Sequence, residues 1–280
     1  MPTLSYWNAL WFAIVQGITE LFPVSSVAHA VLIPALFPVP IDLDALLPFT
    51  VMLHLGTAFS LLLFYWREWL SFLLALFKKE KTTARDVFWR VVLGTIPAAL
   101  IGFFFLDKLR AHFPSGASAA FFLMVNGLIL WIADGRRRKA PVTSPDVDRE
   151  IARLTPLQSM GVGLAQSLAL IPGFSRSGMT MVAGLYAGLS YSAAARFAFL
   201  LGTPIILGAG LVEVPRLFEP QFRPILGPSI VGALGAGAAA YLAVTILVNY
   251  FRRHEVEAFR PFALYCLLVG AAAFLYLRFF

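Results

Sequence analysis

The stretch Gln16–Pro34, QGITELFPVSSVAHAVLIP, places a glutamine, a glutamate, two serines and a histidine inside an otherwise apolar segment. Proline cannot continue a helix, so a helix that enters this stretch is expected to end at FPVSS. The second such interruption is IPGFSRSG, which begins at Ile171. Each interruption leaves apolar pieces on both sides that are short for a bilayer crossing of about 20 residues. These two stretches decide how the rest of the chain is read.

The composition indicates a membrane protein. Of the 280 residues, 59% are hydrophobic and 13% are charged, and the mean hydropathy is +0.79. Soluble domains have an apolar share nearer to half. The alternating segments of about ten residues that mark a membrane β-barrel are absent from the sequence. We therefore expect an all-α polytopic membrane protein. The net charge of +7 is clustered, which indicates topology and contact with anionic membrane lipids, and no nucleic acid partner is expected.

The basic residues predict which loops face the cytoplasm. Three loops, 78–90, 135–153 and 252–260, hold fourteen Lys and Arg residues, among them the run Arg136–Lys139, whereas the other loops hold four. The positive-inside rule places these three loops in the cytoplasm. The predicted spans are 46–77 (with 69–77 as an interfacial extension), 87–106, 117–134, 195–215, 227–248 and 261–280. Both termini are then predicted to lie outside, in a bacterial plasma (inner) membrane.

The remaining apolar pieces must enter and leave on one side, so they predict two re-entrant hairpins, 4–37 from the outside and 157–190 from the cytoplasm. Gln16 corresponds to Gln166 and Ser25 to Ser175, both at an offset of 150 residues. The chain therefore reads as an inverted-topology repeat, in which each half is one re-entrant hairpin plus three transmembrane helices. The halves are 1–134 and 157–280, and 135–156 is the predicted cytoplasmic linker. Paired interruptions in such repeats point to a site near the midplane.

The first tip supplies a carboxylate and hydroxyl groups. Gln16 and Glu20 are four residues apart and share a helix face. Glu20 is costly in an apolar segment unless it is paired or hydrated, so it marks a site or an interfacial pair. Ser25 and Ser26 are either helix caps or reactive hydroxyls. His29 is either packed in the core or a base, and the sequence leaves open whether Glu20 or His29 is the base.

The second tip supplies an anion-binding set. Arg176 at membrane depth requires an anion, and its planar guanidinium suits phosphate oxygens. A structural ion pair with Glu20 is the alternative. Ser175, Ser177 and Thr180 add hydroxyl donors beside the N-terminus of the following helix. A nucleophile and a base opposite an anion clamp favour phosphoryl transfer on a lipid phosphate or diphosphate. A divalent cation, Mg²⁺ or Ca²⁺, is expected between Glu20 and phosphate oxygens.

QGITELFPVSS followed by His29, and PGFSRSG followed by Thr180, resemble the two signature motifs of the bacitracin-resistance type of undecaprenyl-diphosphate phosphatase. The resemblance covers essentially the whole chain. It implies hydrolysis of undecaprenyl diphosphate to the monophosphate on the outer side of the membrane, lipid-carrier recycling for peptidoglycan synthesis, bacitracin resistance and dependence on divalent cations. It also implies substrate-binding or acid–base roles for Gln16, Glu20 and His29, a nucleophilic role for Ser26, and phosphate binding by Arg176.

The chain departs from the family pattern at two places. Val27 and Ala28 follow the serine pair where the family has a small hydroxylated residue and then glycine, and the extra methyl group of Ala28 is expected to crowd the turn. His54 stands where the family has glutamine, and we expect it to line the site and bind substrate. The alternative function is a transporter or flippase of a polyprenyl phosphate or small anion, because inverted repeats are also transporter architecture. The glycine-rich segment that begins at Gly227 predicts close helix packing or a homodimer.

Overall fold

The computed structural model describes residues 4–37, 43–112, 115–137, 146–254 and 256–279, and in these ranges the chain forms helices and no strands. Six of the described helices are long and apolar enough to cross a membrane. They are α3 (Leu43–Phe64), α5 (Thr83–His112), α6 (Gly116–Arg137), α10 (Tyr191–Glu213), α11 (Arg223–Arg253) and α12 (Arg260–Phe279). The prediction of an all-α polytopic membrane protein is confirmed.

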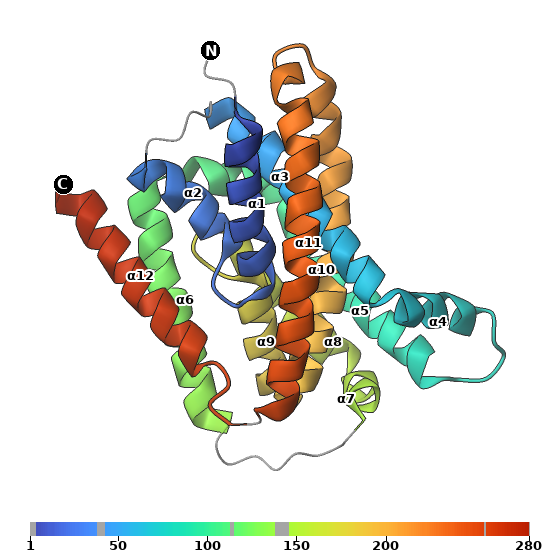
Figure 1. Ribbon diagram of the computed structural model, residues 1–280. Coiled ribbons are helices and arrows are strands. Elements are labelled where there is room, and N and C mark those ends of the chain that lie inside the picture. The colour runs from blue at the N-terminus through green and yellow to red at the C-terminus, as the bar shows by residue number, and fades with distance from the viewer. Residues whose placement is uncertain (1–3, 38–42, 113–114, 138–145, 255, 280) are drawn as a thin grey trace.

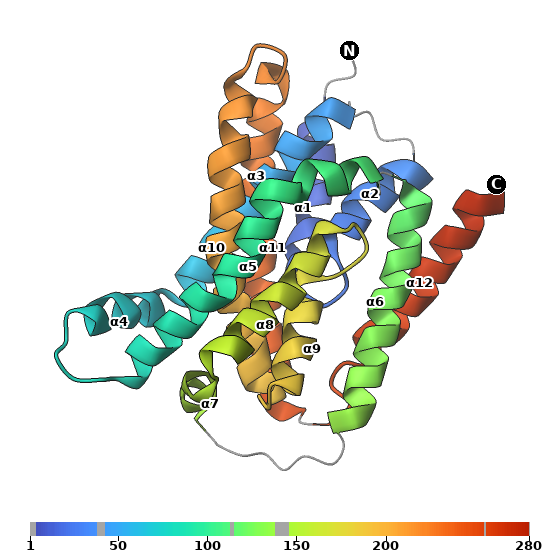
Figure 2. The same ribbon diagram turned by 180° about the vertical axis from the view of Figure 1, so that it is seen from behind.

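Two further pairs of helices are too short to cross. The first pair is α1 (Tyr6–Leu21) and α2 (Ser26–Leu36), and the second is α8 (Pro156–Gln166) with the 3₁₀ turn η1 (Ser167–Leu170), followed by α9 (Arg176–Tyr186). At 1.5 Å per residue each helix is shorter than the bilayer core of about 30 Å. Each pair turns back inside the molecule, and the two pairs enter from opposite ends (Figures 1 and 2). This arrangement is the one expected of an inverted repeat, which itself stays a prediction.

The predicted segment 46–77 forms two helices, and the second of them corresponds to the predicted interfacial extension, 69–77. Helix α3 ends at Phe64, and after Tyr65 the chain continues as a separate helix, α4 (Trp66–Leu76), which turns away from the bundle (Figure 1). Helix α4 buries Phe72 and Ala75 and exposes Trp66, Leu70, Leu73 and Leu74. Its first turn also carries Arg67 and Glu68, which are costly in the hydrocarbon core, so an in-plane position at the interface is favourable.

The predicted linker 135–156 contains a docked helix, α7 (Val147–Arg153). Ile151 is fully buried, and Glu150 accepts hydrogen bonds from the backbone N–H (2.8 Å) and the hydroxyl (3.1 Å) of Ser190, the N-cap residue of α10. This segment therefore holds the start of α10 in place in addition to connecting the two halves of the chain. The side chains of Arg136 and Arg137, and the residues Arg138 and Lys139, lie outside the described part of the chain.

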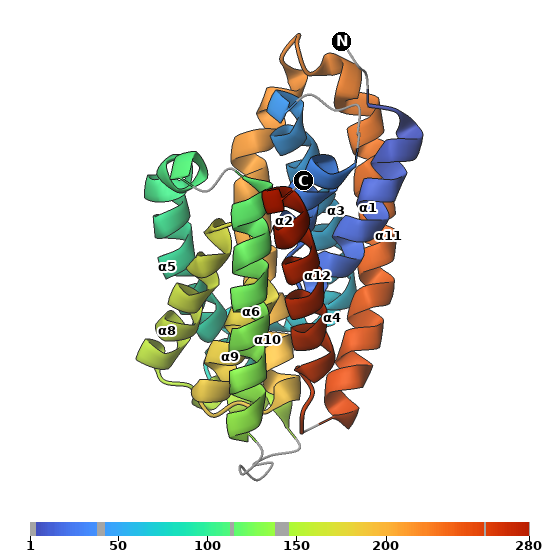
Figure 3. The same ribbon diagram turned by 90° about the vertical axis from the view of Figure 1, so that its left-hand side faces the viewer.

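Small residues let the helices approach closely. A Cβ atom on Gly17 of α1 would lie 2.4 Å from the Ala236 carbonyl oxygen, and one on Gly56 of α3 would lie 1.9 Å from the Ala233 carbonyl oxygen. Both carbonyls belong to α11, so the glycine- and alanine-rich face of α11 is used within the chain against α1 and α3. Helices α6 and α12 lie side by side along one flank (Figure 3). A homodimer stays a prediction.

Candidate active site

The tips of the two hairpins meet inside the bundle. Ser177 of the second tip donates a hydrogen bond from its hydroxyl to the Phe22 carbonyl oxygen of the first, at 3.2 Å. Asn126, fully buried on α6, joins both tips: its amide nitrogen donates to the Pro23 carbonyl oxygen at 3.0 Å, and its side-chain oxygen accepts from the Ser175 backbone N–H at 2.9 Å. The backbone groups released where the helices break are thus bonded to protein, as membrane depth requires.

Each tip contains a residue with a positive φ angle. Gly173 has φ of 117°, and a Cβ atom there would lie 2.4 Å from Cβ of Phe122, so only glycine fits. Ser25 has φ of 64°, which is strained for a residue with a side chain. Its hydroxyl accepts a hydrogen bond from the Ala28 backbone N–H at 3.2 Å, so Ser25 is the N-cap of α2. The capping interpretation is right for Ser25, and the strained turn lies directly before Ser26.

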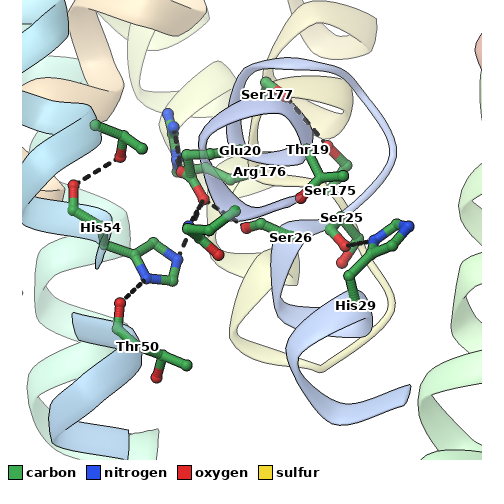
Figure 4. A network of polar contacts seen from close by, with 12 residues as sticks. Thr19, Glu20, Ser25, Ser26, His29, Thr50, His54, Ser175, Arg176 and Ser177 are labelled. Atoms are coloured by element: carbon green, nitrogen blue, oxygen red, sulfur yellow. Dashed lines mark hydrogen bonds and ion pairs between the residues drawn. The ribbon is translucent and has the colours of Figure 1, made fainter. Parts of the chain in front are cut away.

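Glu20 is the centre of the polar network (Figure 4). One carboxylate oxygen, Oε1, accepts hydrogen bonds from Nη2 (2.7 Å) and Nε (3.2 Å) of Arg176. The other, Oε2, accepts from the Ser26 hydroxyl at 2.5 Å and from the Gln16 amide nitrogen at 3.2 Å. His54 Nε2 lies 3.1 Å from the same Oε2. The network brings four predicted site residues, Gln16, Ser26, His54 and Arg176, around the buried carboxylate of Glu20.

His54 lies between two acceptor groups. Its Nδ1 lies 2.7 Å from the Thr50 carbonyl oxygen, which only accepts, so Nδ1 carries a proton. Its Nε2 lies 3.1 Å from the Glu20 carboxylate, and this contact is an ion pair when Nε2 is also protonated. An imidazolium at this position gives Glu20 a second cationic neighbour beside Arg176. The site then carries a net positive charge, which favours an anion.

His29 lies apart from this network. Its Nδ1 donates to the Ser25 carbonyl oxygen at 2.8 Å, and its Nε2 lies 2.7 Å from the Tyr265 hydroxyl, which can donate. A neutral ring satisfies both contacts. Within the described residues neither ring nitrogen bonds Ser26. The geometry thus places Glu20, and not His29, within proton-transfer reach of the Ser26 hydroxyl, while His29 holds the carbonyl group of the strained residue Ser25.

Arg176 fits against α10 because residue 202 is glycine. Its Nη1 donates to the Ala198 carbonyl oxygen at 3.3 Å. A Cβ atom on Gly202 would lie 2.0 Å from Nη1 and 2.6 Å from Cζ. The predicted alternative, an ion pair with Glu20, is present at 2.7 Å. The guanidinium is therefore buried between a carboxylate and a helix backbone at the edge of the cavity.

A cavity of about 450 Å³ opens beside this network. Its polar end includes Glu20, Ser26, His54, Ser175 and Arg176, and the rest of its lining is mostly aliphatic. That size is typical of a small-molecule site. Of the predicted hydroxyl residues in the described chain, Ser177 and Thr180 do not line the cavity. Their hydroxyls bond the carbonyl oxygens of Phe22 and Arg176 instead, so they support the tips.

A family model described as "Bacitracin resistance protein BacA" matches residues 9–272. The chain belongs to the BacA family. It is 44% identical over 279 residues to "Undecaprenyl-diphosphatase" of Acidiphilium cryptum, covering 97% of this chain and 98% of that relative. It is 43% identical over 272 residues, 95% of each chain, to "Undecaprenyl-diphosphatase 2" of Burkholderia thailandensis. It is 40% identical over 301 residues, 98% of each chain, to "Undecaprenyl-diphosphatase" of Mycolicibacterium paratuberculosis.

Three polar residues of this BacA-family site were missed by sequence reasoning: Asn126, Tyr265 and Gln166. Asn126 interrupts an apolar span, which is a usable signal for a buried polar role. Tyr265 gives no such signal, because a tyrosine near a span end reads as an interfacial anchor. Gln166 was read only as the repeat counterpart of Gln16, yet it lines the cavity.

The donor set offers little to a resident metal ion. Among the described residues no group of three or more His, Cys, Asp or Glu side chains is arranged to hold one. In the described part of the chain Glu20 is the single carboxylate that lines the cavity, and both its oxygens already accept hydrogen bonds. A divalent cation in this BacA-family protein fits only with the substrate phosphates as its other ligands, which is how Mg²⁺ is commonly bound.

Proposed function

We propose that this chain hydrolyses undecaprenyl diphosphate to undecaprenyl phosphate and inorganic phosphate. The observation that carries the proposal is the 2.5 Å hydrogen bond from the Ser26 hydroxyl to Glu20, opposite Arg176, at the polar end of a cavity with aliphatic walls. A hydroxyl paired with a base beside an anion clamp performs phosphoryl transfer. The aliphatic walls suit the prenyl chain, and the names of the relatives support the same substrate.

In the first step Ser26 Oγ attacks the terminal phosphorus while Glu20 accepts the hydroxyl proton. The Oγ–P bond forms as the bond to the bridging oxygen breaks, and the electron pair leaves with the prenyl monophosphate. Water then attacks the phosphorus of the phosphoserine, and the P–Oγ bond breaks with its electron pair left on Oγ. Inorganic phosphate leaves with both protons of the water, and the proton held by Glu20 returns to Ser26 Oγ.

Charge stabilisation comes from Arg176 and His54. When the diphosphate enters, the guanidinium exchanges part of its contact with Glu20 for phosphate oxygens, for which its planar fork is suited. The imidazolium of His54 keeps Glu20 ionised and adds a second positive charge. Because both groups are in place once the diphosphate is bound, little reorganisation is required at the moment of reaction.

A divalent cation, Mg²⁺ or Ca²⁺, is part of the proposal. Glu20 would hold it together with oxygens of the bound diphosphate, and the ion would neutralise charge on the phosphates. Glu20 therefore has two proposed tasks, and the experiment on Glu20 in the Discussion separates them.

The proposed setting is the outer side of the bacterial plasma membrane, where hydrolysis recycles the lipid carrier for peptidoglycan synthesis and confers bacitracin resistance. The distribution of charge supports this orientation. Helix α11, whose last turn carries Arg252 and Arg253, ends on the side of the molecule opposite the start of α1 and the end of α12 (Figure 1).

The test is phosphate release from undecaprenyl diphosphate by the purified protein in detergent, with Mg²⁺ or Ca²⁺ and with EDTA. We expect release that requires the cation and falls at least about 10³-fold in Ser26→Ala, because no other hydroxyl among the described residues bonds Glu20. The matched control is Ser71→Ala on the exposed face of α4, which should keep full activity.

Two results would contradict the proposal. A well-folded wild-type protein that releases no phosphate would favour the transporter or flippase. Full release by Ser26→Ala would leave the phosphatase in place and remove Ser26 as the nucleophile.

His54 gives a prediction for the pH dependence. Its contribution requires the imidazolium, so it is present below the pKa of His54 and lost as the pH rises through that pKa. We expect the wild-type kcat to fall on the alkaline side, and His54→Gln to show a lower plateau, by about tenfold, without that alkaline limb. The measurement is the pH–rate profile of both proteins.

His254→Gln, a change at an exposed histidine after α11, is the control and should match the wild type. If the alkaline limb persists in His54→Gln, it comes from another titratable group and the prediction for His54 is wrong.

A further inference from the structure

One buried side chain in the cavity has no partner. Gln166 is the last residue of α8 and only 2% exposed. Neither its amide nitrogen nor its side-chain oxygen makes a hydrogen bond in the described part of the chain. Buried carboxamides are normally bonded, and an unpaired one costs free energy, so its presence requires an explanation.

The other buried amides of the site show the contrast. Gln16 donates to Glu20, and Asn126 uses both its nitrogen and its oxygen to hold the two hairpin tips. Gln166, the counterpart of Gln16 in the predicted repeat, is the one amide of these three whose polar atoms have no hydrogen-bond partner among the described residues. It lines the same cavity as Glu20 and Arg176. An unsatisfied polar side chain in the lining of a cavity that also contains an anion clamp is suited to a polar ligand.

The hydrogen-bonding groups of a carboxamide limit the class of ligand that it can bind. Its nitrogen offers two donors and its oxygen one acceptor, without charge. Phosphate oxygens accept from such donors. A neutral donor binds them without adding to the positive charge that Arg176 and His54 already supply.

We propose that Gln166 is a substrate-binding residue that donates hydrogen bonds from its amide nitrogen to the diphosphate head group. This inference rests on the proposed function, because it assumes that the diphosphate occupies the cavity. Gln166 has no part in proton transfer, so it acts on binding and leaves the chemical step to Ser26 and Glu20.

The test is Gln166→Met, which keeps an unbranched side chain of similar length and removes both polar atoms. We expect the KM for undecaprenyl diphosphate to rise about tenfold while kcat changes less than about threefold, since a hydrogen bond to a charged group is lost. We expect the Tm to stay equal or rise, because an unpaired buried amide has been removed. A role limited to structure would lower the Tm instead.

Gln158→Met on the same helix is the matched control with the opposite expectation. Gln158 accepts from the Thr155 backbone N–H at 2.8 Å in a capping box and donates to the Ala187 carbonyl oxygen at 3.3 Å. Its replacement should lower the Tm and leave KM unchanged.

A binding measurement keeps the inference separate from the proposed function. Inorganic pyrophosphate should raise the Tm of the wild-type protein by a larger amount than that of Gln166→Met, whether or not phosphate is released. An equal rise in both proteins, an unchanged KM in a folded Gln166→Met, or a lowered Tm would overturn the role of Gln166. Absence of hydrolysis by the wild type together with a smaller rise in the variant would overturn the proposed function alone.

Discussion

Glu20→Gln is expected to lower kcat about 10³-fold while KM stays within a fewfold of the wild-type value. Glutamine cannot take the proton that the Ser26 hydroxyl now shares with Oε2 of Glu20 at 2.5 Å. A positioned general base contributes about 10²–10⁴ in rate. Substrate binding should survive, because Arg176 is released from the carboxylate and stays free to meet phosphate. The measurement is steady-state phosphate release across a range of substrate concentrations.

The concentration of divalent cation separates the two proposed tasks of Glu20. If Glu20 is the base, the loss persists at every Mg²⁺ or Ca²⁺ concentration. Recovery of kcat at high cation concentration would show that Glu20 is only a cation ligand, and the base would have to be sought elsewhere. Glu213→Gln is the matched control, since Glu213 is also mostly buried and pairs with Arg216 at 3.0 Å outside the cavity. It should leave kcat unchanged.

The sequence contained enough to predict that polar residues gather at the two tips, but not to choose between Glu20 and His29 as the partner of Ser26. Pro23, Pro172 and Gly173 break helices in apolar segments, and Glu20 and Arg176 are too costly there without a partner, so both tips were predictable. The choice between Glu20 and His29 depends on the φ angle of 64° at Ser25, after which the Ser26 side chain bonds Glu20. No spacing rule predicts a strained turn of that kind.

Contacts between distant parts of the chain could not be predicted from the sequence either. Asn126 joins the two tips from a helix about 100 residues after the first tip and 50 before the second. Tyr265 reaches His29 from the last helix. An interfacial extension was predicted at 69–77, but the exact position of the break after Phe64 was not, because the apolar run continues through it. Each of these depends on tertiary packing that a local pattern does not encode.

The expected effect of Ala28, a departure from the family pattern, can be compared with the structure. Its methyl group was expected to crowd the turn after the serine pair. In the structure Ala28 lies within the first turn of α2, fully buried, and its backbone N–H bonds the Ser25 hydroxyl. The helix begins at Ser26 and accommodates the side chain. His54 is the departure that enters the polar network, because its Nε2 lies 3.1 Å from Oε2 of Glu20.

Gly202→Ala is expected to lower kcat/KM about 10²-fold without contacting the substrate. The new Cβ atom would lie 2.0 Å from Nη1 and 2.9 Å from Nη2 of Arg176, so the guanidinium must leave its position against α10. Displacing a group that stabilises transition-state charge costs about 10²–10³ in rate. Alanine is also the better helix former by about 1 kcal/mol, so the helix itself should not be weakened. The measurement is kcat/KM for phosphate release, with the Tm as a check on folding.

Two comparisons assign the effect to the arginine. Gly208→Ala on the same helix places its Cβ where no atom lies within 4 Å, so it should leave kcat/KM unchanged. In an Arg176→Ala background, Gly202→Ala should have almost no further effect, since the side chain that it displaces is gone, and the two changes should be strongly non-additive. Full activity in Gly202→Ala alone would mean that the guanidinium binds phosphate from a position away from α10. Additive losses would mean that residue 202 acts on the helix and not on Arg176.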